Sequence, residues 1–171
     1  GNREALLAGA RRCLLEKGYV QTTARDIANA SGVSLAAIGY HFGTKESLLQ
    51  EAMVEANVEW GERISSAVES MKIPEGDSWA DWFEHVWGRI ISVTEEDKRL
   101  LMASLEILMN TDHALPVCKS IGTGMTNAGD ALVRIFGHEI DEPTPGERAA
   151  LGKFYFALEI GVRLLHGSKP E

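Results

Sequence analysis

A chain of 171 residues, 44 % of them hydrophobic, is long enough to bury a sizeable core in one or two domains. Its net charge of −8 argues at first sight against a nucleic-acid partner, but residues 1–47 carry +2 and the remainder carries −10. A mildly basic head on an acidic body fits a protein that holds DNA at one end only. Because no apolar run approaches the roughly 20 residues that span a bilayer and no signal-peptide pattern opens the chain, we expect a cytoplasmic protein.

Apolar residues recur at helical spacing over residues 3–17, which predicts a first helix, and Gly18 fits the position after its end. The next two predicted helices are short and cannot bury a core alone, so the first helix must lie beneath them. The expected core of this N-terminal head consists of Leu6, Leu7, Ala10, Leu14, Tyr19, Ile27, Val33, Ile38 and Phe42.

The pattern of a helix-turn-helix follows. Thr23, with Asp26 three residues later, forms a variant capping box at the start of a second helix. Gly32 can adopt the left-handed conformation that reverses the chain, and Ser34 can cap a third helix over residues 35–41. Two short helices joined by a glycine-containing turn are typical of DNA-binding proteins that place the second helix in the major groove.

The rest of the chain also shows helical periodicity. A long helix is predicted from a cap at Thr44 to about residue 71, and shorter helices follow over 78–93 and 98–109. Two final helices are expected over 116–136 and from a cap at Thr144 to residue 166. Since no strand-like alternation appears, the predicted fold class is all-α.

Five motifs in the head resemble the TetR family of transcriptional regulators: EKGY at 16–19, TTARDIA at 22–28, GVS at 32–34, YHF at 40–42 and KESLL at 45–49. The resemblance is strong over the first 50 residues, whereas the body matches only in length and helical character. It implies a DNA-binding head over 1–47 and a helical ligand-binding and dimerisation body over 48–171. Such a homodimer, usually a repressor, binds a palindromic double-stranded DNA operator, and a small molecule in the body alters the spacing of its heads.

The candidate DNA contacts are Thr23, Arg25, Ser34, Leu35, Ala36, Ala37, Gly39, Tyr40, His41 and Lys45. The guanidinium of Arg25 suits either a guanine edge or a phosphate. Residues 35–37 are small and apolar, which favours thymine-methyl contacts and close backbone approach. The hydroxyls of Thr23 and Ser34 serve equally as plain helix caps, and His41 could equally be a packed core histidine.

One position departs from the family pattern. Many members carry an aromatic residue immediately after the position of Ile38, where this chain has Gly39. Either Tyr40 takes over the phosphate contact, or the backbone at Gly39 lies closer to DNA. Glycine weakens a helix by about 1 kcal/mol relative to alanine, which favours a recognition helix that becomes firm on DNA.

Aromatic residues and methionines in the central helices predict a pocket for a small, largely apolar effector. Its candidate residues are Trp60, Trp79, Trp82, Phe83, Met102, Glu106, Met109 and Asn110. The alternative is that each is an ordinary core residue. The last two helices are apolar on more than one face, so we expect them to form a four-helix homodimer interface.

Other chemical sites are weakly supported. The glycines of residues 122–129 follow no strand and lack phosphate-loop spacing, so close helix packing explains them better. Asp77, Asp81 and His85 share one helical face, but a closed metal site needs about four ligands, and we expect a solvated face. Cys13 and Cys118 are isolated and read as core or near-core thiols.

No catalytic constellation is visible, so we predict a protein that is not an enzyme and carries no cofactor or metal. Two alternatives belong to other classes. One is an all-α binding protein that has lost DNA binding, and the other is an enzyme with an incidental helix-turn-helix.

Overall fold

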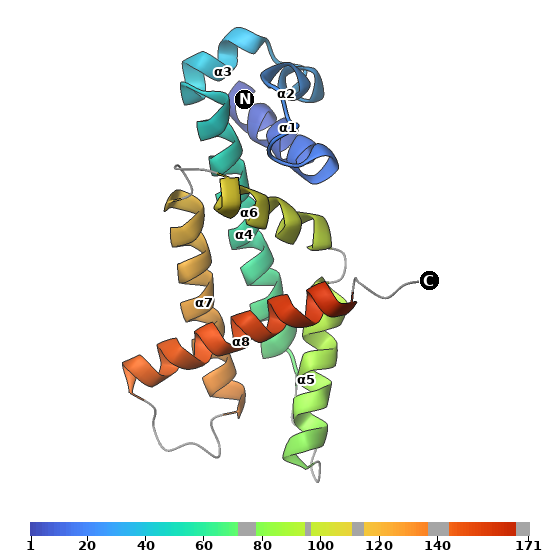
Figure 1. Ribbon diagram of the computed structural model, residues 1–171, viewed down its shortest axis with the longest axis vertical. Coiled ribbons are helices and arrows are strands. Elements are labelled where there is room, and N and C mark those ends of the chain that lie inside the picture. Colours follow the sequence, from blue (N-terminus) through green and yellow to red (C-terminus); the bar gives the residue numbers. More distant parts are fainter. Residues whose placement is uncertain (72–77, 95–96, 111–114, 137–143, 167–171) are drawn as a thin grey trace. The chain divides into compact units, whose positions relative to one another are not determined.

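The computed structural model describes residues 1–71, 78–94, 97–110, 115–136 and 144–166. Across these ranges the chain forms eight α-helices and no strand, which confirms the all-α prediction (Figure 1). The helices lie close to their predicted ranges: α1 (Asn2–Lys17), α2 (Ala24–Ser31), α3 (Leu35–Phe42), α4 (Lys45–Glu69), α5 (Trp79–Thr94), α6 (Lys98–Asn110), α7 (Leu115–Phe136) and α8 (Pro145–His166). None of them combines the length and apolar character needed to cross a bilayer.

Local capping explains where several helices begin. The backbone N–H of Asp26 donates to Thr23 Oγ1 at 3.1 Å, and the N–H of Thr23 donates to Asp26 Oδ2 at 2.9 Å. The predicted capping box of α2 is therefore confirmed. Thr44 caps α4 in the same way, because its hydroxyl accepts from the N–H of Ser47 at 3.0 Å.

The turn between α2 and α3 confirms one prediction and corrects another. Gly32 lies in the left-handed region at φ 69°, as the reversal of the chain requires. Ser34 holds the N-cap position of α3, but its exposed hydroxyl makes no capping hydrogen bond, so the predicted side-chain cap is wrong. Its carbonyl instead accepts from the N–H of Ala37 at 3.0 Å, and the backbone alone starts the helix.

The chain divides into two compact units, Gly1–Glu59 with Arg99–Ile121 and Trp60–Lys98 with Gly122–Glu171. The first unit thus contains more than the head, since the start of α4 and nearly all of α6 pack into it. The functional boundary after residue 47 stays a prediction. Because α4 contributes to both units, it links them covalently as one continuous helix.

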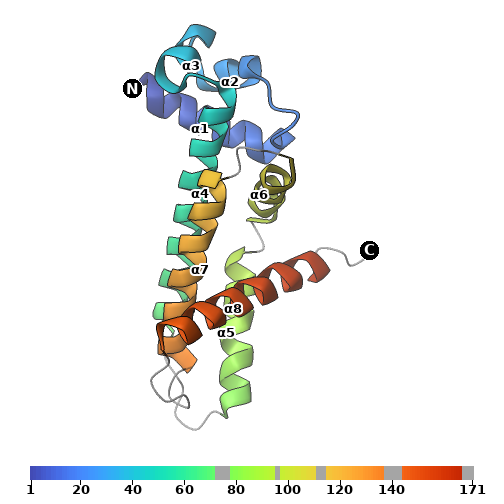
Figure 2. The same cartoon turned by 60° about the vertical axis from the view of Figure 1, so that its left-hand side comes forward.

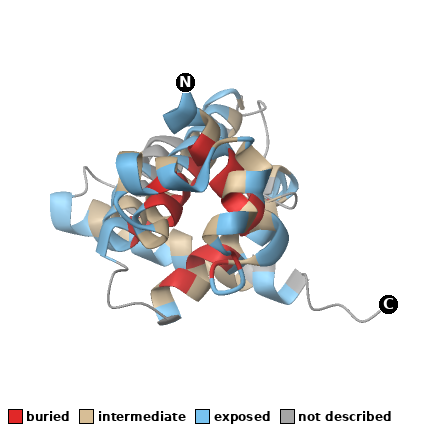
Figure 3. Cartoon of the chain, turned by 90° about the horizontal axis from the view of Figure 1, so that it is seen from above, coloured by how far each residue is buried: buried red, intermediate tan, exposed pale blue. Residues whose placement is uncertain are grey.

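Seven of the nine expected head-core residues are buried, while Val33 and Phe42 are half-buried. The guanidinium of Arg3 lies over the Phe42 ring, 5.1 Å from its centroid, and covers part of that half-buried ring. Side chains of α4, α6 and α7 extend the core of the first unit, and Figure 3 shows the buried turns in red. They are Leu48, Leu49, Ala52, Met53, Ala56, Leu100, Ala103, Ile107 and Val117.

The second unit has an aromatic core in which α8 packs across α5 (Figures 1 and 2). Its buried members, all from α5, are Trp82, Val86, Trp87 and Ile90, and the half-buried side chains packed against them are Ile64, Met71, Phe83, Tyr155 and Leu158. We refer to these nine side chains, the four buried and the five half-buried ones, as the α5 cluster.

The start of α8 is capped as predicted. Thr144 and Glu147 form a capping box, in which the N–H of Glu147 donates to Thr144 Oγ1 at 3.3 Å and the N–H of Thr144 donates to the Glu147 carboxylate.

The cysteine prediction is half right. Cys13 is buried in the first unit, and burial raises the pKa of its thiol. Cys118 is exposed: it follows the buried Val117 on α7 and is turned about 100° from it around the helix, out of the core.

Candidate nucleic-acid interface

One face of α3 is open to solvent. Leu35, Ala36, Gly39 and Tyr40 are all exposed, and their spacing places them side by side on the helix. Ile38 is buried and anchors the opposite face in the head core. Tyr40 is 86 % exposed, so its hydroxyl is free to reach beyond the helix. This surface presents small and apolar groups with a single phenol, as direct contact with base edges and methyl groups would require.

Gly39 leaves the middle of this face flat. A Cβ built at this position meets nothing within 4 Å, so no neighbouring part of the protein requires glycine there. Gly39 also keeps its helical conformation, since its φ is not positive. The absence of a side chain leaves the backbone at this point of the outer surface uncovered, and glycine is the residue that allows the closest approach of the backbone to another molecule.

Arg25 is the available cation of the head. The other five Lys and Arg residues of 1–47 have intramolecular partners: Arg3 with Glu51, Arg11 with Glu59, Arg12 with the carbonyl of Ala30, Lys17 with Asp26, and Lys45 with the carbonyl of Thr22. Arg25 is exposed in the first turn of α2, and within the described residues it has no hydrogen bond or ion pair. A partner-free guanidinium at this position can bind a base edge or phosphate without breaking an existing contact.

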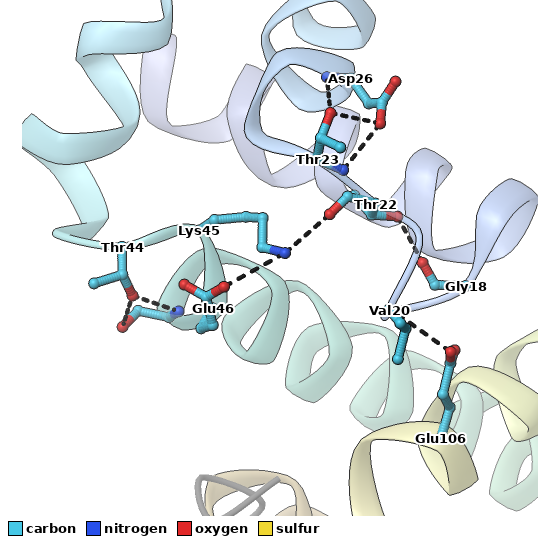
Figure 4. A network of polar contacts seen from close by, with 10 residues as sticks. Gly18, Val20, Thr22, Thr23, Asp26, Thr44, Lys45, Glu46 and Glu106 are labelled. Atoms are coloured by element: carbon cyan, nitrogen blue, oxygen red, sulfur yellow. Dashed lines mark hydrogen bonds and ion pairs between the residues drawn. The ribbon is translucent and has the colours of Figure 1, made fainter. Parts of the chain in front are cut away.

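The start of α2 is held in place by charge. Lys17 Nζ lies 2.6 Å from Asp26 Oδ1. The other carboxylate oxygen of Asp26 accepts from the N–H and the hydroxyl of Thr23 (Figure 4). The Lys17 ammonium, followed by the Thr23 hydroxyl and N–H, holds the pKa of Asp26 well below its usual range. The carboxylate stays ionised and internally bonded, so its negative charge is partly neutralised beside Arg25.

Lys45 has a structural contact of its own. Its ammonium donates to the carbonyl of Thr22 at 3.0 Å and lies 3.4 Å from Glu46 Oε1 (Figure 4). The Thr22 side chain is buried, and its hydroxyl donates to the carbonyl of Gly18 at 2.6 Å. Lys45 thus connects the start of α4 to the segment that leads into α2. Its ammonium could contact a DNA phosphate only in addition to these two contacts or in place of one of them.

The turn between α1 and α2 is also bound by α6. The carboxylate of Glu106 accepts from the N–H of Tyr19 at 2.6 Å. It also accepts from the N–H of Val20 at 3.2 Å (Figure 4). Glu106 is one of the residues predicted from the sequence to contact the ligand. In the structure it accepts hydrogen bonds from two backbone N–H groups of the segment that precedes Thr23, and so helps to position the start of α2.

The remaining candidate DNA contacts surround the open face. Thr23 and Ser34 are exposed near the starts of α2 and α3, whereas Ala37 and His41 are half-buried. The His41 ring lies edge-on to that of Tyr40, with centroids 4.9 Å apart, and so supports the exposed phenol.

The candidate ligand residues fall into both units. Trp82 and Phe83 belong to the α5 cluster and Trp60 is half-buried in the same unit, whereas Met102, Glu106 and Met109 belong to the first unit. Met109 is 83 % exposed and Met102 is 49 % exposed. The side chains of Trp79 and Asn110 lie outside the described residues. Trp87 also belongs to this cluster and was not among the predicted ligand residues, although its position one turn after Phe83 could have indicated it.

The predicted solvated stripe on α5 is described in part. Asp81 and His85 are exposed, and Asp81 caps the helix by accepting from the hydroxyl of Ser78 at 2.6 Å. Asp77 lies outside the described residues. Among the residues that are described, no three His, Cys, Asp or Glu side chains gather as metal ligands.

Comparison with known proteins agrees with this geometry. Residues 6–52 match the model of a family described as bacterial regulatory proteins, tetR family. The HTH-type transcriptional repressor AcnR of Corynebacterium efficiens is 41 % identical over 64 residues, which are 37 % of this chain and 34 % of that protein. The sequence similarity to this relative therefore spans about a third of its length.

Two solved structures share the fold over nearly the whole chain. SCO7518 of Streptomyces coelicolor A3(2) matches with a TM-score of 0.71 at 22 % identity, covering 99 % of this chain and 89 % of the other. A TetR transcription regulator of Haloarcula marismortui matches with a TM-score of 0.70 at 21 % identity, covering 95 % and 84 %. At these identities the likeness concerns the fold alone.

Proposed function

Residues 6–52 match the model of the tetR family of bacterial regulatory proteins, and from that match we propose that the chain is a ligand-responsive, dimeric transcriptional regulator of this family. It acts as a repressor in the cytoplasm, binding a palindromic operator through α2 and α3. A small molecule bound in the second unit alters the separation of the two heads and releases the DNA.

One observation carries the DNA-binding proposal. The exposed face of α3 lies in the same head as Arg25, which has no hydrogen bond or ion pair among the described residues, whereas the other Lys and Arg residues of the head are engaged. Because Arg25 makes no polar contact with the described residues, it adds no hydrogen bond or ion pair to the fold, and binding of an external anion or base edge explains its position in the first turn of α2 better. In the proposed complex, α3 lies in the major groove, where Leu35 and Ala36 contact thymine methyls and Gly39 permits close approach.

The proposed dimer forms through α7 and α8. On α8, Phe154 and Leu165 are 61 % and 75 % exposed, and their separation of eleven residues, or about three turns, puts them on one face. Exposed large apolar side chains on one helical face mark an interaction surface, and a two-fold contact between identical faces is the commonest arrangement.

The proposed response to ligand uses α4. This helix contributes Lys45 and the following turns to the first unit and Trp60 and the following turns to the second. Half-sites on an operator lie about 34–36 Å apart, so a change in the direction of α4 in each subunit would take both heads out of register with successive major grooves.

Fluorescence anisotropy with labelled DNA from the region flanking its own gene tests the proposal. We expect sequence-preferring binding that weakens steeply with salt, because phosphate contacts release counterions. A scrambled duplex of equal length is the control. Equal affinity for both duplexes at moderate salt would contradict the proposal.

A further inference from the structure

Two buried donors in the second unit lack acceptors. The side chains of Trp82 and Trp87 are 6 % and 7 % exposed, and neither indole Nε1–H has a hydrogen-bond partner in the described part of the chain. An indole nitrogen can only donate. Leaving such a group buried and unsatisfied is costly, and native structures rarely keep two of them in one core without a purpose.

Their surroundings are aromatic and aliphatic. The Trp87 ring lies 5.9 Å from that of Phe83 and 6.0 Å from that of Tyr155, measured between centroids. Val86 and Ile90 complete the buried part of the α5 cluster. Among the described side chains of the cluster, the hydroxyl of Tyr155 is the one oxygen acceptor, and it bonds to neither indole. Within the described residues, an acceptor for these two indoles therefore has to come from a bound molecule.

Charge narrows the chemistry of that acceptor. The ionisable side chains of α5 are all exposed: Asp81, Glu84, His85 and Arg89. On the other two helices of the cluster, Arg63 of α4 and Lys153 of α8 are exposed and Arg148 pairs with Asp130. Among the described residues of these helices, no cation therefore stands beside the indoles to offset a buried carboxylate, whose burial without a counter-charge is very costly. A neutral oxygen acceptor meets the need of both indoles at a far smaller desolvation cost.

We infer that the α5 cluster is the effector site and that the effector is a neutral carbonyl compound, such as a ketone, ester or lactone, on an apolar or aromatic body. This inference rests on the proposed ligand-responsive function. The carbonyl oxygen has two lone pairs and can accept from one or both indole N–H groups. The rings of Phe83, Trp87 and Tyr155 contact the apolar body.

Matched probes separate the carbonyl group from its hydrophobic body. Acetophenone and cumene have nearly the same shape, as do benzophenone and diphenylmethane, but only the ketones carry an acceptor. We expect the full chain, labelled with 15N in its indoles, to show saturable downfield shifts of the Trp82 or Trp87 indole proton with a ketone and not with its hydrocarbon. We also expect the ketone to bind about tenfold more tightly, the scale of one buried hydrogen bond regained. Benzoate, which adds a charge, should bind more weakly than acetophenone.

Variants assign the effect to the donors. Trp82→Phe and Trp87→Phe keep an aromatic ring but remove an N–H, and loss of the responding donor should reduce the ketone preference to about one. Tyr155→Phe is the control from the same cluster, since it removes a hydroxyl but no indole, and should keep the preference. Equal affinity for ketone and hydrocarbon in both pairs with the unaltered chain, or a ketone preference that survives both Trp variants, would overturn the inference. Thermal unfolding of each variant verifies that it is folded.

The outcome is separable from that of the proposed function. Ligand-free protein is tested against operator DNA in parallel. Operator binding without any ketone preference contradicts this inference and leaves the regulator proposal standing. A ketone preference without operator binding supports the site and contradicts the regulator proposal.

Discussion

Glu106 on α6 accepts a 2.6 Å hydrogen bond from the backbone N–H of Tyr19, a residue 87 positions earlier in the chain. The same carboxylate accepts from Val20, and a Cβ at Gly18 would lie 2.7 Å from Glu106 Oε2. Gly18 has φ +82°, so glycine suits both the turn and the close approach of the carboxylate. The segment leading into α2 and α3 is therefore held by a helix from the middle of the chain.

Removing that carboxylate should weaken the head. We expect Glu106→Ala to lower the free energy of unfolding by about 1–3 kcal/mol, because the backbone N–H of the buried Tyr19 loses its acceptor. Operator affinity should fall as well, since the start of α2 is less well positioned. Urea unfolding and anisotropy measure the two effects. Glu106→Gln keeps one oxygen acceptor, so its stability should lie between those of the unaltered chain and Glu106→Ala. Unchanged stability and operator affinity in Glu106→Ala would refute the proposed role of Glu106.

Arg25 and Lys45 should differ in how they contribute. Arg25→Ala removes a partner-free side chain, so stability should hardly change while the preferred operator base pair loses about 1–3 kcal/mol of discrimination. Lys45→Ala removes the hydrogen bond to Thr22 and should cost about 1 kcal/mol of stability, with a similar loss of affinity for every DNA sequence. Anisotropy against single-base operator variants, with denaturation curves beside it, makes the comparison. A sequence-blind loss for Arg25→Ala would make it a phosphate anchor only.

The sequence predicted what depends on near neighbours. Helix ranges follow from apolar spacing, and the capping boxes at Thr23 and Thr144 join residues three apart, so both could be read from the chain. Ser34 shows the limit of that reasoning, because a capping residue type at the right position can leave its hydroxyl to solvent.

Contacts between distant segments could not be predicted in this way. The roles of Glu106 at Tyr19 and of Lys45 at Thr22 depend on how helices far apart in sequence meet, and neither residue type names its partner. The exposure of Cys118 could not be predicted for the same reason. Whether a thiol on a helix points into an apolar core or into solvent depends on how that helix is rotated about its axis.

Acid should weaken the head through Asp26. Its pKa is lower in the folded chain than in the unfolded chain, so the stabilisation it provides is fully present above the unfolded value, about pH 4, and is lost as the pH falls further. Asp26→Asn should flatten the fall in stability below about pH 4, as measured by thermal unfolding. Asp81→Asn is the matched control, because Asp81 caps α5 with Ser78 and also has a lowered pKa. Both should change acid stability, but only Asp26→Asn should change operator affinity.

Charge on α8 should prevent dimerisation. Phe154→Glu with Leu165→Glu places two carboxylates on the exposed apolar face, where a second copy would have to bury them unpaired. We expect sedimentation to show a dimer for the unaltered chain and a monomer for the double variant, with helical content preserved. Lys153→Glu, on the same turn but already charged, is the control. A double variant that remains dimeric would place the interface elsewhere.

Gly39 offers a test in which stability and function move in opposite directions. Gly39→Ala adds a methyl group where nothing lies within 4 Å, so the only effect inside the protein is a more favourable helix, worth about 1 kcal/mol. If the backbone approaches DNA at this point, the methyl group intrudes on the contact and operator affinity should fall about tenfold or more, even though the melting temperature rises. Gly61→Ala in α4 is matched, since its Cβ also meets open space and should raise stability without changing DNA binding. Tighter operator binding by Gly39→Ala would instead mean that α3 becomes ordered on DNA and that its glycine costs affinity.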